Sequence, residues 1–219
     1  WLKPRIKSLS YLPLGVNIKT AQLGVNNFNK LLNVMLSKEY TMVSKFFPKF
    51  IDILRNIENL RIIVVNSLKD VKINVSDGVK YCDGNFKSII STINDNVKKC
   101  LSEKKDVKFM IIFLGYGSLE KSLEKEKEED SSIVTIDELI FNSKSIDNFS
   151  YILYDQEKLI SLLDDGIISN EFKHNSAIWL GKGFDEQELL ETEAYYNTDS
   201  VTNNNLIILE NGRAQIIKY

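Results

Sequence analysis

The stretch Leu31–Leu54, LLNVMLSKEYTMVSKFFPKFIDIL, decides the fold of this chain. Its apolar start, Leu31–Met35, predicts a buried strand. Further on, apolar residues recur at helical spacing and predict one buried helix face: Val43, Phe46, Phe47, Phe50, Ile51 and Leu54. Pro48 is expected to kink this helix or delay its start. A strand, a short loop and a helix in this order form the unit that holds the phosphate loop of a nucleotide-binding α/β domain.

In the loop between this strand and this helix, none of the motif positions carries the group that phosphate binding needs. A phosphate loop uses glycines for its turn, a lysine for the β- and γ-phosphates and a hydroxyl for Mg²⁺. When GxxxxGK[ST] is laid over the loop, the two glycines fall on Leu36 and Thr41, the lysine on Met42 and the hydroxyl on Val43. The degenerate phosphate-loop region therefore comprises Leu36, Ser37, Lys38, Glu39, Tyr40, Thr41, Met42 and Val43.

The rest of the chain alternates short apolar runs with amphipathic segments, which is typical of α/β units. Further strands are expected at Arg61–Asn66, Phe109–Leu114, Tyr151–Tyr154 and Ala177–Leu180, and a second helix between Phe86 and Val97. Leu206–Leu209 and Ala214–Ile217 flank an Asn-Gly turn and predict a terminal β-hairpin. We therefore expect one α/β domain over residues 1–219, with a mainly parallel sheet of the P-loop NTPase type, flanked by helices and closed by the hairpin.

The acidic half of a nucleotide site is missing as well. In a domain that hydrolyses ATP, the strand ending at Leu114 would be followed by an Asp-Glu pair that holds Mg²⁺ and activates water. Here Gly115 and Tyr116 stand in those places, and the first carboxylate is Glu120. Losing two or three charge-assisted hydrogen bonds of roughly 1.5–3 kcal/mol each would weaken micromolar nucleotide binding to about millimolar or beyond. We assign no catalytic, cofactor-binding or metal-binding residue and expect no cofactor.

Two alternatives remain open. In the first, the chain is a weakly active ATPase whose Lys38 or Lys45 stands in for the missing lysine. In the second, it is an unrelated α/β ligand-binding enzyme that binds an anion at the turns LGYG (Leu114–Gly117) or LGKG (Leu180–Gly183), although we expect these turns simply to leave the sheet.

The composition excludes several functions. Hydrophobic residues make up 43% of the 219 residues, and a net charge of −2 disfavours nucleic-acid binding. Cys82 and Cys100 have no metal-ligand spacing, and the single histidine, His174, is expected in a surface loop. The longest apolar run, Phe109–Leu114, is far shorter than the ~20 residues of a membrane span, and no secretory signal is visible. Trp1 in place of an initiator methionine suggests a piece of a longer protein.

Local composition gives two more expectations. Lys121–Asp130, KSLEKEKEED, predicts a solvated helix end or loop. The segment Asn74–Asn85 carries two Asp-Gly pairs, which favour tight turns or a short hairpin.

Four stretches of sequence carry a resemblance to a known family. They are WLKP with PLGVNIKT (Trp1–Pro4 and Pro13–Thr20), FMIIFLGYGSLEKSL (Phe109–Leu123), SAIWLGKGFDEQELLE (Ser176–Glu191) and NNLIILENGRAQIIKY (Asn204–Tyr219). In order and spacing, the chain resembles the last, degenerate ATPase-like domain of the EssC-type membrane ATPases of type VII secretion systems, which belong to the FtsK/SpoIIIE superfamily.

The resemblance implies a place in an ATP-driven protein-transport motor anchored in the cell membrane. The domain would lie on the cytoplasmic side and act in substrate recognition, docking and regulation of secretion. Its implied partners are secreted proteins of the WXG100 class and the neighbouring ATPase domains of the parent chain, which can oligomerise. No catalytic residue of the family matches a position of this sequence, so ATP turnover would belong to other domains of the parent.

Overall fold

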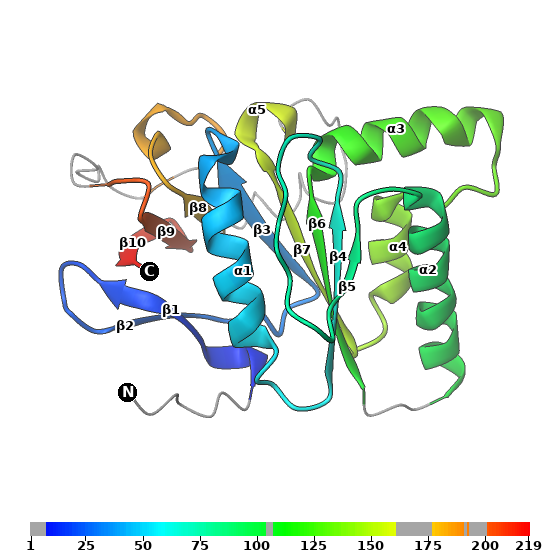
Figure 1. Ribbon diagram of the computed structural model, residues 1–219, viewed down its shortest axis with the longest axis horizontal. Helices are drawn as coiled ribbons and strands as arrows, with labels where there is room; N and C mark the ends of the chain where they lie inside the picture. Colours follow the sequence, from blue (N-terminus) through cyan, green and yellow to red (C-terminus); the bar gives the residue numbers. More distant parts are fainter. Residues whose placement is uncertain (1–7, 104–106, 161–176, 191, 193–200) are drawn as a thin grey trace.

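A ten-stranded sheet runs through the chain in the order β2-β1-β10-β9-β8-β3-β7-β6-β4-β5 (Figure 1). The computed structural model describes residues 8–103, 107–160, 177–190, 192 and 201–219. The strands are Leu12–Asn17 (β1), Leu23–Asn26 (β2), Leu32–Ser37 (β3), Leu60–Asn66 (β4), Lys80–Cys82 (β5), Lys108–Leu114 (β6), Phe149–Gln156 (β7), Ala177–Leu180 (β8), Asn205–Glu210 (β9) and Arg213–Lys218 (β10).

The sheet has a parallel part and an antiparallel part. Strands β8, β3, β7, β6, β4 and β5 run parallel, so their carboxyl ends meet at one edge. Strands β9, β10, β1 and β2 continue the sheet with antiparallel pairing. The mainly parallel α/β sheet expected from the sequence, with its C-terminal hairpin, is thus confirmed.

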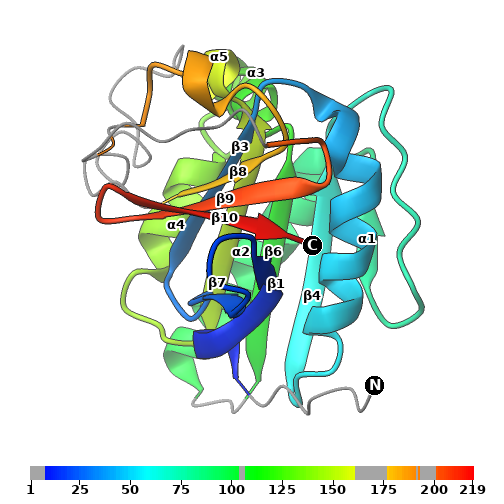
Figure 2. The same ribbon diagram turned by 90° about the vertical axis from the view of Figure 1, so that its left-hand side faces the viewer.

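Helices cover both faces of the parallel part. They are α1 (Val43–Leu54), α2 (Phe86–Ser102), α3 (Tyr116–Glu129), α4 (Ile136–Ser143) and the short α5 (Glu157–Ile160), with 3-10 turns η1 (Leu9–Tyr11), η2 (Tyr40–Met42) and η3 (Phe184–Glu186). Figures 1 and 2 show α1 on one face and α2 and α4 on the other. Two buried clusters result, one containing the phenylalanines of α1 and one containing the isoleucines and leucines of α2 and α4.

The expected strands and helices are present, and most extend by a few residues beyond their predicted ends. The predicted strand Leu31–Met35 is β3, and Tyr151–Tyr154 is the centre of the eight-residue β7. The charged segment Lys121–Asp130 forms the end of α3, as the solvated-helix interpretation requires. His174 and the stretch WLKP lie outside the described residues.

Three local expectations are met in part. From the sequence, Pro48 is expected to kink helix α1 or delay its start; the helix begins at Val43 with Pro48 inside it, so its start is not delayed, and burial of Val43, Phe46 and Phe47 anchors the first turn. At LGYG the chain leaves the sheet as expected, but it passes at once into a helix, because α3 begins directly after its N-cap residue Gly115 (φ 82°). Of the tight turns or short hairpin expected for Asn74–Asn85, a turn is present at Asp77-Gly78; it leads into β5, which is parallel to β4, so the two strands form no hairpin.

Candidate functional site

The candidate site is the edge where the carboxyl ends of β3, β6, β7 and β8 meet, because ligands of parallel α/β sheets bind there. Strand β3 ends at Ser37, Lys38 and Glu39 follow, and η2 leads directly into α1. The strand, short loop and helix expected from the sequence are therefore present. The edge lies at the top of Figure 1.

The loop positions that would carry phosphate-binding groups face the core. Met42 and Val43, which take the places of the lysine and the hydroxyl, are 1% and 0% exposed. The Sδ atom of Met42 lies 3.6 Å from the Oη atom of Tyr219. Leu36 and Ser37 are buried within β3, and Ser37 shares a 2.6 Å hydrogen bond with the hydroxyl of Tyr154. A lysine at position 42 would thus place its charge in apolar surroundings.

A buried carboxylate, Asp155 at the end of β7, organises this edge. The backbone N–H of Gly117, in the first turn of α3, donates to its Oδ2 atom over 2.8 Å. The hydroxyl of Tyr40, in the degenerate loop, donates to its Oδ1 atom over 2.5 Å. A helix N-terminus attracts anions through its free N–H groups and its dipole. Asp155 is the anion that this chain supplies to α3, and Tyr40 ties it to the loop.

Burial and hydrogen bonding act against each other on Asp155. Burial raises the pKa of its carboxyl group above the ordinary value, and this effect exceeds the lowering by donors that include Tyr40, Gln156 and Gly117. Gly117 is required for this close approach, since a Cβ there would lie 2.9 Å from the carbonyl oxygen of Leu159 and 3.3 Å from Asp155 Oδ2.

The two lysines considered as stand-ins are placed differently. Lys38 forms an ion pair with Glu186 of η3, and this partner raises the pKa of its ammonium group. Lys45 is exposed on α1. Beside the ion pair lies a cavity of about 230 Å³. Its lining includes Lys182, Glu39 and Asn203.

The side chains that follow β6, Tyr116 and Glu120, form hydrogen bonds with α4 and not with the loop after β3. Tyr116 donates from its hydroxyl to Asp137 of α4 over 2.6 Å. Glu120 is 1% exposed and accepts hydrogen bonds from the backbone N–H groups of Ile136, over 2.7 Å, and Asp137, over 3.1 Å. Burial, followed by the nearby carboxylate of Asp137, raises the pKa of Glu120 to about 7. Glu120 therefore joins α3 to the N-terminus of α4 and lies away from the phosphate loop.

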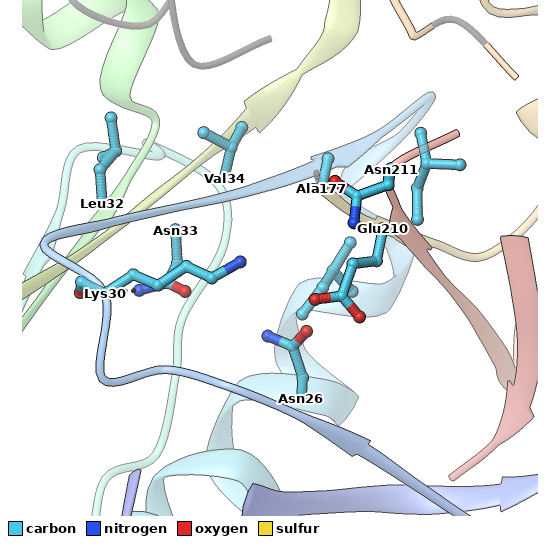
Figure 3. Close-up of a pocket in the computed structure, with 10 residues that line it drawn as sticks. Asn26, Lys30, Leu32, Asn33, Val34, Ala177, Glu210 and Asn211 are labelled. Carbon is cyan, nitrogen blue, oxygen red and sulfur yellow. Dashed lines mark hydrogen bonds between the residues drawn. The ribbon is translucent and has the colours of Figure 1, made fainter. Parts of the chain in front are cut away.

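A second cavity, of about 240 Å³, lies at the opposite ends of the strands. Figure 3 shows Lys30 and Glu210 projecting from opposite sides into it, with the amides of Asn26, Asn33 and Asn211 around them. Its floor is apolar and includes Val34 and Ala177. The cavity thus combines charges of both signs with several amide donors and acceptors.

Sequence reasoning did not identify the role of Asp155. The signal was present, because an aspartate directly after the buried run YILY falls at the ligand-binding edge of a parallel sheet. The cluster of Glu120, Asp137 and Tyr116 was also missed, since it joins two helices that the sequence did not separate.

Within the described ranges, no three His, Cys, Asp or Glu side chains are grouped so that they could share a metal ion. In the same part of the chain, none of the helices has the length and apolar character to cross a membrane. Cys82 and Cys100 are free thiols.

Comparison with solved structures places this fold among secretion and conjugation ATPases. EssC (ATPases 2 and 3) from Geobacillus thermodenitrificans superimposes with a TM-score of 0.69 at 10% identity, over 100% of this chain and 42% of that one. Thermomonospora curvata EccC (ATPases 2 and 3), in complex with a signal sequence peptide, gives 0.64 at 10% identity over 95% and 40%. The conjugation coupling protein TcpA of pCW3, a monomer with ATPγS, gives 0.60 at 9% identity over 100% and 68%.

The sequence matches no protein-family model and no curated protein. The chain spans less than half the length of the EssC and EccC chains to which it is similar. Each of those chains holds two ATPase domains, and the match extends over all or nearly all of this chain. This chain therefore has the fold of an EssC-type ATPase domain.

Proposed function

We propose that this chain is a nucleotide-independent docking and regulatory module of a type VII secretion motor. The carrying observation is the hydrogen-bonded group of Tyr40, Asp155 and Gly117, in which the chain's own carboxylate lies at the N-terminus of α3. A nucleotide phosphate at this edge would have to approach a buried aspartate and separate Tyr40 from it. Like charges at close range oppose such binding.

The proposal extends to the place of the chain in its assembly. Its structural neighbours are ATPase domains of EssC and EccC, and one EccC structure holds a signal sequence peptide. We infer that this chain lies on the cytoplasmic side of the membrane, contacts other ATPase domains of its parent and takes part in recognising secreted proteins of the WXG100 class.

Calorimetric titration with MgATP tests the nucleotide part. We expect no heat of binding up to about millimolar nucleotide. Tyr40→Phe provides the matched variant, because it removes one of the two donors to Asp155 Oδ1 without adding a group that binds phosphate. It should also show no binding. Micromolar, Mg²⁺-dependent binding by the unmodified chain would refute the proposal, and its loss in Lys38→Ala would revive the weak-ATPase alternative.

For docking, we assign the contact to the cavity between Lys30 and Glu210. Amides such as Asn33 and Asn211 can both donate to and accept from the backbone of an extended peptide, and the opposed charges can orient it. The cavity lies at the amino ends of β3 and β8 (Figure 3). Asp155 lies at the opposite edge of the sheet, where the parallel strands end.

Fluorescence anisotropy with a labelled signal-sequence peptide of a WXG100 protein tests this assignment. Lys30→Glu should weaken binding several-fold, and combining it with Glu210→Lys should recover part of the loss, because the two charges are exchanged. Lys182→Glu, at the other cavity, is the control and should leave affinity unchanged. Equal affinity in all variants would exclude this cavity, and no binding by any protein would refute docking of this peptide class.

A further inference from the structure

The hairpin of β1 and β2 presents an apolar face to solvent. Seven large hydrophobic side chains are exposed among the described residues, and five of them belong to the hairpin and its entry: Tyr11, Val16, Ile18, Leu23 and Val25. Leu23 is 60% and Val16 46% exposed, and these two residues face each other across the strand pair. Grouped exposed apolar side chains indicate an interaction surface more strongly than scattered ones.

Packing holds this face outward. On the inner face of β2, a Cβ at Gly24 would lie 2.3 Å from the Cδ1 atom of Ile217 in β10. The backbone of β2 therefore packs directly against the side chain of Ile217. Ile217 is fully buried. The hairpin therefore has no room to turn over and bury Leu23 or Val25, and their exposure is a property of the fold.

The free edge of β2 lacks the usual protection against strand pairing. In the part of the sheet that the structure describes, β2 is the last strand on its side (Figure 1). Natural edge strands are commonly guarded by charged side chains. Here Lys19, in the connection, is the only charged residue from Ser8 to Asn29, in a chain with 26% charged residues.

The backbone of β2 has two residues whose hydrogen-bonding groups point to this edge. The carbonyl of Gln22 accepts a hydrogen bond from the N–H of Asn17. Because backbone groups alternate in direction along a strand, the N–H and C=O groups of Gln22, Gly24 and Asn26 point toward β1. The N–H and C=O groups of Leu23 and Val25 then point away from β1, toward the free edge. The pairing of Val25 with Pro13, which has no N–H to donate, agrees with this pattern.

We propose that β2 pairs with β2 of a second copy of this chain, antiparallel and about a twofold axis at Gly24. This register places Leu23 opposite Val25 of the second copy, and Val25 opposite its Leu23. Both pairs use the outward backbone groups, which gives about four hydrogen bonds. Both also bring aliphatic side chains together on the outer face, next to Val16. The strand thus complements itself, as an isologous interface requires.

The interface is small, so the dimer is weak. A four-residue strand pair buries well under the ~1,200 Å² of a stable standard interface. We therefore expect association only at high protein concentration, with a dissociation constant of about 10–100 μM. Sedimentation velocity over a concentration series that spans this range should show a reversible monomer–dimer equilibrium.

Two substitutions on β2 test the interface. Leu23→Lys places a charge in the apolar face, and Val25→Pro removes an outward donor without affecting a bond to β1; each should abolish the dimer. Phe141→Lys, at a 63% exposed side chain on α4, is the matched control and should leave dimerisation unchanged. Circular dichroism should show that all variants remain folded. A chain that stays monomeric at every concentration, or a dimer that survives both β2 substitutions, would overturn the proposal.

Cross-linking tests the register. In a background with Cys82→Ser and Cys100→Ser, the double variant Leu23→Cys with Val25→Cys should form disulfides between copies on mild oxidation, because directly opposed residues lie about 5.5 Å apart at Cα. Peptide mapping should find position 23 linked to position 25. Links between two positions 23, or the absence of links at concentrations where the dimer forms, would exclude this twofold arrangement.

Discussion

The stability of this chain should fall as pH rises from about 4.5 to about 7 because of Glu120. This carboxyl group is buried beside Asp137, and its pKa rises from 4.5 to about 7 in the folded state. The folded chain therefore binds this proton more tightly than the unfolded chain does. Stability from Glu120 is fully present below the unfolded pKa and is lost as pH passes through the folded value. A shift of this size corresponds to about 3 kcal/mol.

Urea unfolding of the chain and of Glu120→Gln, at a series of pH values between 4 and 8, measures this effect. The glutamine variant stays neutral, so its free energy of unfolding should decline less over this range. The difference between the two declines should be about 3 kcal/mol. Asp155 also has a raised pKa and contributes a decline to both proteins, so the difference between the curves is the relevant quantity. Glu128→Gln, at an exposed carboxylate of the same helix that is not among the groups acting on Glu120, should follow the unmodified chain. Parallel curves for the chain and Glu120→Gln would refute the reasoning.

Three further substitutions test other contacts by urea unfolding. Tyr40→Phe removes the hydroxyl that donates to buried Asp155 and should cost about 1.5–3 kcal/mol; unchanged stability would mean that this hydrogen bond does not hold the loop. Thr135→Ala removes the side chain that caps α4 through a capping box and should cost about 1 kcal/mol, whereas Ser122→Ala on exposed α3 should cost little. Gly117→Ala should cost about 1–3 kcal/mol, since its Cβ would meet the Leu159 carbonyl of α5; a neutral result would show that α5 and α3 can separate.

The parallel half of the sheet could be predicted because its strands are apolar on both faces and interrupt amphipathic segments. Runs such as Phe109–Leu114 leave no other assignment, since both faces of β6 are buried. The hairpin of β1 and β2 could not be predicted in the same way. Its strands are short, and exposed Leu23 and Val25 break the alternation that normally marks a half-buried strand.

The loss of the phosphate-binding groups could be predicted from the sequence, but the hydrogen bond between Tyr40 and Asp155 at this edge could not. The positions of Met42 and Val43 follow from counting along the motif, and the structure places both in the core. The hydrogen bond between Tyr40 and Asp155 joins residues 115 positions apart. Such a contact depends on which strands lie side by side, and local sequence patterns carry no information about strand order.

The carboxylate of Asp155 has a mechanical consequence. ATPase domains change shape because the edge of their sheet alternates between a filled and an empty condition, and loops there follow the phosphate. In this chain the same edge carries its own carboxyl group, joined to the first turn of α3 and to the loop after β3. On the function that we propose, this edge has no phosphate to follow. In the motor that we propose, such a domain would provide a fixed surface against which the domains that cycle can move.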